Sequence, residues 1–311
     1  MGTISLNPQN GLAVSLAGGG AILLWSGTAI ANKIAVAYMD PMTAGVLRSM
    51  LAGLVAVGIV LAARLPRPGS SAQWGLLLVS GISSFAVWPM LMSLGLGHTT
   101  ANHTVLIMAI LPALTGLLGS GLERRLPGRG WWLGIGIAMA GTVYLIFSRS
   151  RGVLLTEAGG TAGDLIVFVG TLVCAVGYVA GGRLAPAIGT WSTTLWGLSA
   201  ALVVLIPAFV LRMGLTDWAS VGTRGWSAIA YMTLLSSLAG YAAWFWALGH
   251  GGIARIGSWQ FMQPVLSVGL AALLLGEAIT LQLAAAAATI LLGTALAQRR
   301  ATKLRPVSSP R

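Results

Sequence analysis

Long runs of apolar residues, separated by short stretches rich in proline, glycine, arginine or histidine, follow one another along the 311-residue chain. A bilayer core of about 30 Å needs about 20 apolar residues of α-helix to cross it. Cutting the runs at these breaks predicts ten membrane-spanning helices. The predicted spans cover roughly residues 12–37, 43–63, 72–96, 102–121, 130–148, 163–182, 191–211, 225–247, 256–275 and 281–297.

The composition supports an integral membrane protein. Hydrophobic residues make up 56% of the chain and charged residues only 8%, and the mean hydropathy is +0.86. A soluble domain carries roughly a quarter charged residues, so the composition excludes a soluble enzyme. The 43 glycines suit closely packed membrane helices. With a single cysteine, Cys174, no disulfide can form within the chain.

The basic residues predict the orientation. The net charge is +12, but the lysines and arginines lie mostly at the ends of apolar runs, so no nucleic-acid partner is needed to explain them. Twelve of the 18 fall on the side of the N-terminus, four on the opposite side and two within spans. Because short cytoplasmic loops are enriched in positive charge, we expect both termini, including a basic tail over 298–311, to be cytoplasmic.

The two halves of the chain share a pattern of spacings. His98 precedes Pro112 by 14 residues, and His250 precedes Pro264 by the same 14. Since each half holds five predicted spans, an odd number, the second half must enter the membrane from the opposite face. The pattern predicts an inverted duplication, with one repeat over 12–148 and the other over 163–297. Such repeats are typical of transporters that open a central site alternately to each side.

These motifs bring out a family resemblance. The sequence resembles the drug/metabolite transporter superfamily, in particular its ten-helix members with two EamA domains, and most of all the bacterial aromatic amino acid exporters of the YddG type. The resemblance covers nearly the whole chain. It rests on the following segments: Leu24-Trp25-Ser26-Gly27 to Lys33, Pro41-Met42-Thr43 to Leu47-Arg48, Ala247-Leu248-Gly249-His250, Gln263-Pro264-Val265 and Leu275-Gly276-Glu277. It implies an all-α bundle around a central cavity lined by both repeats, in a bacterial inner membrane.

Charged residues within spans point to function, because a charge at a helix centre costs about 2.5 to 3.5 kcal/mol on insertion scales. Lys33 shares a helix face with Trp25, and we expect Lys33, together with Arg48, to attract a substrate carboxylate near the outer mouth. Arg183 is the expected counterpart near the inner mouth. The alternative is that Lys33 and Arg183 reach to lipid headgroups while Arg48 ties helix ends together.

Aromatic residues well inside the spans are expected to form apolar cavity walls, and neighbouring polar residues favour this over plain helix packing. The candidate substrate-binding residues are Trp25, Lys33, Arg48, Trp88, Met92, His103, Tyr178, Tyr241, Trp244, Trp259 and Gln263. The candidate gating residues are Pro112, Pro264 and Arg183, where a proline within a span either moves or forms a static kink.

The acidic residues all fall in predicted loops or near span ends, which disfavours proton pumping and a cationic substrate. His103 is the best candidate for protonation, with a hydrogen-bonded histidine at a helix end as the plainer alternative. We therefore predict facilitated diffusion or exchange of amino acids, with aromatic and other apolar ones favoured. Export of another small metabolite or drug, with or without proton coupling, is the alternative.

Other classes of function fit less well. An enzyme within the membrane would need paired acids, a metal cluster or a nucleophile with a base, and three histidines and one cysteine supply none of these. A scaffold or channel is a further alternative that saturable counterflow would separate from a carrier. We expect no catalytic residue, metal ion or cofactor, no partner beyond the small-molecule substrate and the lipid bilayer, and function as a monomer.

Overall fold

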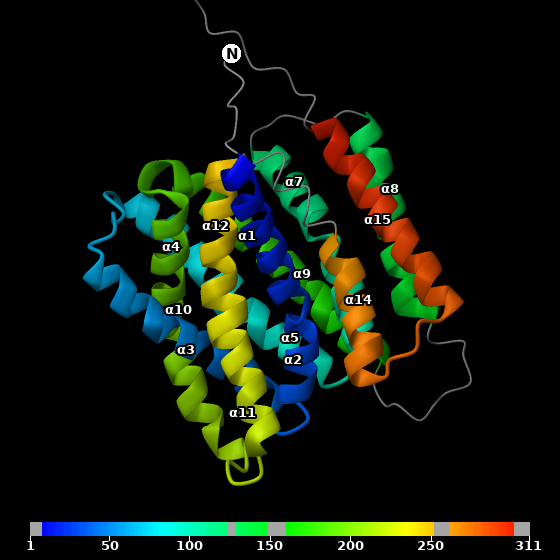
Figure 1. The fold of residues 1–311 in the computed structure, drawn as a ribbon, viewed down its shortest axis with the longest axis horizontal. Coiled ribbons are helices and arrows are strands. Elements are labelled where there is room, and N and C mark those ends of the chain that lie inside the picture. The colour runs from blue at the N-terminus through cyan, green and yellow to red at the C-terminus, as the bar shows by residue number, and fades with distance from the viewer. Residues whose placement is uncertain (1–7, 123–128, 149–159, 252–261, 302–311) are drawn as a thin grey trace, which may run out of the picture.

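The computed structural model describes residues 8–122, 129–148, 160–251 and 262–301, and helices are the only regular secondary structure in these ranges (Figure 1). The helices are α1 (Pro8–Ser26), α2 (Thr28–Ala35), α3 (Pro41–Ala62), α4 (Ser71–Gly81), the π-helix η1 (Ile82–Val87), α5 (Trp88–Leu96), α6 (Ala101–Met108), α7 (Leu111–Leu122), α8 (Arg129–Ser148), α9 (Gly160–Ile188), α10 (Thr190–Arg212), the 3₁₀-helix η3 (Met213–Leu215), α11 (Gly222–Ala230), the π-helix η4 (Tyr231–Ala239), α12 (Gly240–Gly251), α14 (Met262–Leu275) and α15 (Leu281–Ala301).

Several of these helices have the length and apolar composition needed to cross a bilayer. The long apolar stretches within the described residues are Leu12–Ala35, Pro41–Ala62, Ser71–Leu96, Gly160–Ile188 and Thr190–Leu215, and two shorter apolar helices cover Met262–Leu275 and Leu281–Leu296. The five long stretches coincide with the first, second, third, sixth and seventh predicted spans. Within the described residues, the prediction of an all-helical fold with helices long and apolar enough to cross a membrane is therefore confirmed.

Two predicted spans differ in detail. The helix predicted over 163–182 begins at Gly160 and continues past Arg183 to Ile188, because a single charged side chain does not end a helix. The span predicted over 102–121 is divided in two, since α6 ends at Met108 and α7 begins at Leu111. Pro112 is therefore the second residue of a helix, where its missing N–H costs no hydrogen bond, and does not bend a continuous helix.

The helices pack in pairs that run through the bundle (Figure 1). Helices α8 and α15 pack against each other at one edge, and α3 and α10 pack together near the opposite edge. Helices α1 and α12 lie side by side and run in opposite directions, while α9 passes behind them and contacts α4, α5 and α7. The largest buried apolar cluster lies where α5 and α9 meet and extends to α6, α8 and α15.

Close helix contact depends on small residues at these interfaces. A Cβ at Gly181 of α9 would lie 2.7 Å from the Ser80 hydroxyl oxygen of α4, and a Cβ at Gly177 would meet Ser84 of η1. Gly177 and Gly181 are spaced four residues apart and therefore lie on one face of α9. The glycines let α9 approach the third predicted span closely, in agreement with the spacing rule for membrane helices.

A side chain from far along the sequence holds the start of α6. The Glu277 carboxylate, which follows α14, accepts hydrogen bonds from the backbone N–H groups of Ala101 at 2.7 Å and Asn102 at 2.9 Å. These N–H groups lie at a helix N-terminus, where a negative charge is stabilised by the aligned peptide dipoles. The contact fixes the loop after α14 to the first turn of α6.

Candidate functional site

Aromatic side chains from α1, α12 and η1 meet inside the bundle. The ring of Trp25 lies 5.2 Å from that of Tyr241 and 5.3 Å from that of Trp244, and Phe85 lies 6.4 Å from Tyr241. The Trp25–Tyr241 and Phe85–Tyr241 pairs meet edge to face, an arrangement that aromatic rings favour. We call Trp25, Phe85, Tyr241 and Trp244 the aromatic cluster. Three of its members are sequence-predicted site residues, which the structure brings together.

Hydrogen bonds join the first span to the π-helix η4 beside this cluster. The Trp25 indole Nε1 donates to the Ser236 carbonyl oxygen at 2.9 Å, and the hydroxyl oxygens of Thr28 and Ser236 lie 2.7 Å apart. The same span is joined to α14, because the Ser26 hydroxyl donates to the backbone carbonyl of Gln263 at 3.3 Å. A π-helix disturbs the regular backbone hydrogen bonding and often marks a functional site. The Ser236 carbonyl of η4 is the acceptor that holds Trp25 in place.

Arg48 reaches the same π-helix from α3 and is only 9% exposed. One guanidinium nitrogen, Nη1, lies 3.3 Å from the Met232 sulfur of η4, and the Nε atom has no hydrogen-bond partner. A thioether is a weak acceptor, whereas a guanidinium offers five donors. The Arg48 guanidinium also lies near the hydroxyl end of Tyr241. A buried, poorly satisfied cation therefore lies next to the aromatic cluster.

Tyr178 faces the cluster from α9. It interacts with Tyr241 and with Cys174 through its hydroxyl group, yet it exposes 45% of its surface. Its neighbour Cys174 is buried. Tyr178 therefore combines a contact to the aromatic cluster with an accessible face.

Lys33 lies elsewhere and has partners of its own. Its ammonium nitrogen Nζ donates to the carbonyl oxygens of Leu96 at 2.8 Å and Thr99 at 2.5 Å. These carbonyls belong to the end of α5 and the following loop, where the helix dipole favours a cation. The sequence placed Lys33 and Arg48 together at the outer mouth, but their surroundings differ: Lys33 ties α2 to the end of α5, whereas Arg48 contacts η4.

The ring of His103 contacts a buried carboxyl group. Its Nδ1 atom lies 2.8 Å from Oδ2 of Asp164, and the hydroxyl of Thr99 makes a short hydrogen bond to the other carboxylate oxygen. Asp164 is completely buried in α9. The sequence placed this acid near a span end and gave it no role, because nothing local in the sequence links residues 61 positions apart.

The remaining sequence-predicted residues lie in packed or separate surroundings. Trp88 and Met92 of α5 are 7% and 1% exposed and belong to the buried core against α9, and Pro264 is buried in the first turn of α14. The side chain of Pro112 and the whole of Trp259 lie outside the described residues. Gln263 is half-buried and meets Ser26 through its backbone.

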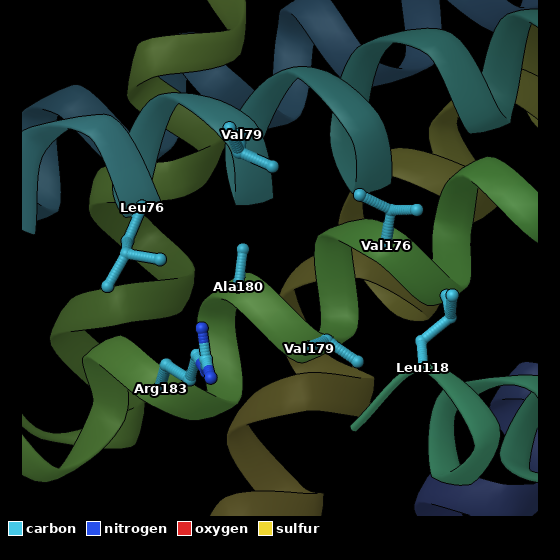
Figure 2. A pocket seen from close by; sticks show the side chains of 7 residues that line it. All are labelled: Leu76, Val79, Leu118, Val176, Val179, Ala180 and Arg183. Carbon is cyan, nitrogen blue, oxygen red and sulfur yellow. The ribbon is translucent and has the colours of Figure 1, made fainter. Parts of the chain in front are cut away.

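Arg183 borders a cavity of about 200 Å³ between α4, α7 and α9 (Figure 2). The cavity is lined by Leu76, Val79, Leu118, Val176, Val179, Ala180 and Arg183. Arg183 is the single charged residue in this lining, and the rest is hydrocarbon. The cavity suits an apolar occupant such as a lipid chain rather than a polar metabolite, and none of the aromatic-cluster residues lines it.

An ion pair joins the end of α10 to the start of α3. Arg212 at the end of α10 donates from Nη2 to Oδ1 of Asp40 at 2.9 Å and from Nε to Oδ2 at 3.1 Å, while Asp40 caps α3 through the Thr43 N–H at 2.8 Å. Burial alone would raise the pKa of the Asp40 carboxyl. Hydrogen bonds from Arg212 and Thr43 outweigh burial and hold the pKa below its usual value of 3.8.

Comparisons with known proteins agree with this architecture. A sequence model of the EamA-like transporter family matches residues 13–147 and again residues 161–298. The uncharacterized transporter YdeK of Bacillus subtilis is 30% identical over 291 residues, which are 89% of this chain and 94% of YdeK. The uncharacterized inner membrane transporter YedA of Escherichia coli is 26% identical over 266 residues, or 83% of this chain and 81% of YedA.

A solved crystal structure has a similar fold. Its chain is 22% identical, superposes with a TM-score of 0.61, and the alignment covers 95% of this chain and 99% of that chain. The family description and the names of the relatives indicate a transporter rather than an enzyme.

Proposed function

Because the chain belongs to the EamA-like transporter family of the drug/metabolite transporter superfamily, we propose that it is an alternating-access carrier that exports amino acids. Aromatic and other apolar amino acids are its favoured substrates, as in the YddG-type exporters that the sequence resembles, and transport occurs by facilitated diffusion or exchange. A zwitterion moves no net charge, so the membrane potential neither drives nor opposes its export.

The proposal includes ten membrane-spanning helices in two inverted five-helix repeats, over 12–148 and 163–297, followed by the tail 298–311. The family model's match to two successive segments supports it. So does the packing, because η1 in the third predicted span has a π-helical counterpart, η4, in the eighth. The main contacts pair the fifth span with the tenth, the second with the seventh, the first with the eighth and the third with the sixth. Exchanging the two repeats turns this set of pairs into itself, as an inverted duplication requires.

The observation that carries the substrate proposal is the aromatic cluster. Trp25 comes from one matched segment and Tyr241 and Trp244 from the other, so the cluster lies where the two segments meet. A carrier binds its substrate at such an interface, since relative motion of the two halves then exposes the site to each side in turn. Aromatic walls next to a cation match an amino acid with an apolar side chain and a carboxylate.

For localisation we propose the bacterial inner membrane with both termini in the cytoplasm. The excess of lysine and arginine in the loops on the N-terminal side supports this orientation. The relative YedA is called an inner membrane transporter, which agrees with the proposed membrane.

The second candidate is a proton-coupled exporter of another metabolite or drug, and the buried His103–Asp164 pair favours it. Proton-coupled carriers use an ionisable group shielded from water, and Asp164 is a completely buried carboxyl group near the start of α9. The pair joins α6 of one matched segment to α9 of the other, so binding or release of a proton there would change the contact between the two segments.

The test is uptake of labelled phenylalanine, tryptophan and methionine into proteoliposomes of the purified protein at equal pH on both sides. Saturable uptake that preloaded unlabelled substrate stimulates is expected from an amino acid carrier without proton coupling. If uptake of these amino acids occurs only with a pH gradient, the second mechanism replaces the first. If none is taken up under either condition, by vesicles that hold a gradient, the amino acid proposal is wrong.

A further inference from the structure

We propose that Arg48 is the carboxylate-binding residue of the substrate site and that the incoming carboxylate replaces the sulfur of Met232 as the partner of its guanidinium. The inference rests on the proposed amino acid carrier and deepens it. It identifies which of the intramembrane cations binds substrate and how the substrate lies in the site.

The first argument is the poor satisfaction of Arg48. A buried guanidinium is stabilised by an anion or by several strong acceptors, because removal of its charge from water is costly. Arg48 is 9% exposed, contacts a neutral sulfur through Nη1 and has an unpartnered Nε. Among the described residues no carboxylate pairs with it. A carboxylate would satisfy the planar fork of donors that Met232 cannot.

The second argument is the contrast with the other cations at the same end of the bundle. Lys33 donates to two backbone carbonyls, and Arg212 binds Asp40 in a bidentate ion pair. Both have the partners that a cation within a protein requires. The remaining arginine on this side of the described structure, Arg224, is exposed, so Arg48 is the buried cation there whose guanidinium is left for a ligand.

The third argument is position. Arg48 contacts Met232 through its side chain, and its backbone carbonyl accepts a hydrogen bond from Thr233 at 3.3 Å, so it lies against the first turn of η4. One turn further, Ser236 holds Trp25, and η4 leads directly into Tyr241 of the aromatic cluster. A carboxylate at Arg48 therefore directs the rest of a small substrate toward Trp25 and Tyr241.

The chemistry of the site limits the class of ligand. One arginine fork matches one planar monoanionic carboxylate, and the neighbouring rings match an apolar or aromatic side chain. The site thus selects a carboxylate-bearing amino acid over the corresponding amine. It also disfavours esters, because esterification removes the charge and one of the two oxygens that the fork requires.

The experiment uses the wild-type protein in proteoliposomes preloaded with phenylalanine. Competitors of labelled phenylalanine uptake are unlabelled phenylalanine, phenylalanine methyl ester and phenethylamine, which lacks the carboxylate. We expect the ester and the amine to compete about 10- to 100-fold more weakly than phenylalanine, as for loss of a hydrogen-bonded ion. Competition by phenethylamine within a factor of about two of phenylalanine would overturn the inference without any variant.

Variants then locate the effect. In Arg48→Gln the half-saturation concentration for phenylalanine is expected to rise about 10- to 100-fold. In Arg48→Lys, which keeps the charge but not the planar fork of donors, this concentration should lie between the values of wild type and Arg48→Gln. The control is Arg224→Gln, which removes an exposed cation from the first turn of α11 and should change this concentration less than about threefold. Lys33→Gln tests the other cation that the sequence offers for the carboxylate. An Arg48→Gln protein with wild-type half-saturation, or a larger effect at Lys33, would show that Arg48 does not bind the carboxylate.

A binding measurement separates failure of this inference from failure of the carrier proposal. The thermal unfolding midpoint of the detergent-purified protein is measured with phenylalanine and with phenethylamine, for wild type and for Arg48→Gln. Stabilisation of wild type by phenylalanine alone, without any uptake, would keep the Arg48 site and overturn the carrier. Saturable uptake that Arg48→Gln leaves unchanged would keep the carrier and overturn the Arg48 site. Absence of both uptake and stabilisation would overturn both proposals.

Discussion

The hydroxyl group of Tyr231 occupies the place where a side chain on Gly27 would have to lie. A Cβ built on Gly27 would come closer to the Tyr231 hydroxyl oxygen than atoms can approach without a shift, and the ring carbon Cζ would lie 3.0 Å away. The hydroxyl donates a hydrogen bond to the Leu24 carbonyl at 2.7 Å. Gly27 separates α1 from α2, so the tyrosine of η4 packs into the break of the first span.

This fit predicts the effect of a single methyl group. Gly27→Ala should displace Tyr231, break its bond to Leu24 and lower the free energy of unfolding by about 1–3 kcal/mol, as is usual for overpacking. Gly20→Ala is the control within the same span, because a Cβ there meets nothing within 4 Å. Unfolding midpoints in detergent check the prediction, and an equal effect of both substitutions would contradict it.

The aromatic cluster predicts a selective loss of affinity. Trp25→Ala removes the indole ring proposed to pack on the substrate ring, a contact worth about 0.5–1.5 kcal/mol, so the half-saturation concentration for phenylalanine should rise about 2- to 12-fold. Trp246→Ala is the control, because Trp246 lies on α12 but exposes 43% of its surface. Uptake kinetics of phenylalanine measure the effect. A wild-type value in Trp25→Ala would exclude the cluster from substrate binding.

The Asp40–Arg212 pair predicts a pH-dependent stability. Since the pKa of Asp40 in the folded protein lies below 3.8, the unfolded chain takes up the proton first as the pH falls. The contribution of the pair is complete above about pH 5 and is lost as the pH falls through 3.8 and the lower folded value. Because the pair is partly exposed, we expect about 1 kcal/mol or less.

The comparison for this pair is Asp40→Asn, which keeps an acceptor for the Thr43 N–H but removes the charge. The difference in unfolding midpoint between wild type and Asp40→Asn should be constant from about pH 5 to pH 8 and shrink below about pH 4. A difference that stays the same down to about pH 3 would show that the ion pair does not cause it.

The His103–Asp164 pair predicts a strong coupling between two helices. Asp164→Asn should destabilise the fold by about 1–3 kcal/mol, because the amide keeps one of the two buried oxygens and leaves either Thr99 or His103 without its acceptor. A double-mutant cycle with His103→Asn should give a coupling energy of about 0.5–3 kcal/mol. Unfolding in mixed detergent micelles provides the free energies. Asp217→Asn, in an exposed loop, is the control and should change stability by about 0.5 kcal/mol or less.

The sequence predicted the helices well and the contacts between them only in part. Apolar length fixes where a helix can cross a bilayer, so most of the helix ends in the described ranges fall within a few residues of those expected. Proline chemistry was the exception, because the break before Pro112 depends on which turn of a helix the proline occupies.

At the candidate site, too, the sequence predicted which residues share a helix face but not which helices meet. Helical spacing grouped Tyr241 with Trp244, but their meeting with Trp25 arises from the packing of α1 on α12. The partners of Lys33 are backbone carbonyls, which every residue has and no pattern marks. Asp164 was missed because burial beside His103 is decided by distant helices.

The contact of Glu277 with the first turn of α6 affects the rate of any movement between the two matched segments. The carboxylate belongs to one matched segment and the two N–H groups to the other. In a transport cycle that separates the segments at this end, both charge-assisted hydrogen bonds must break before the next state forms. Their strength then adds to the activation barrier and not to the binding energy. Glu277 would therefore set the lifetime of this conformation in the transport cycle.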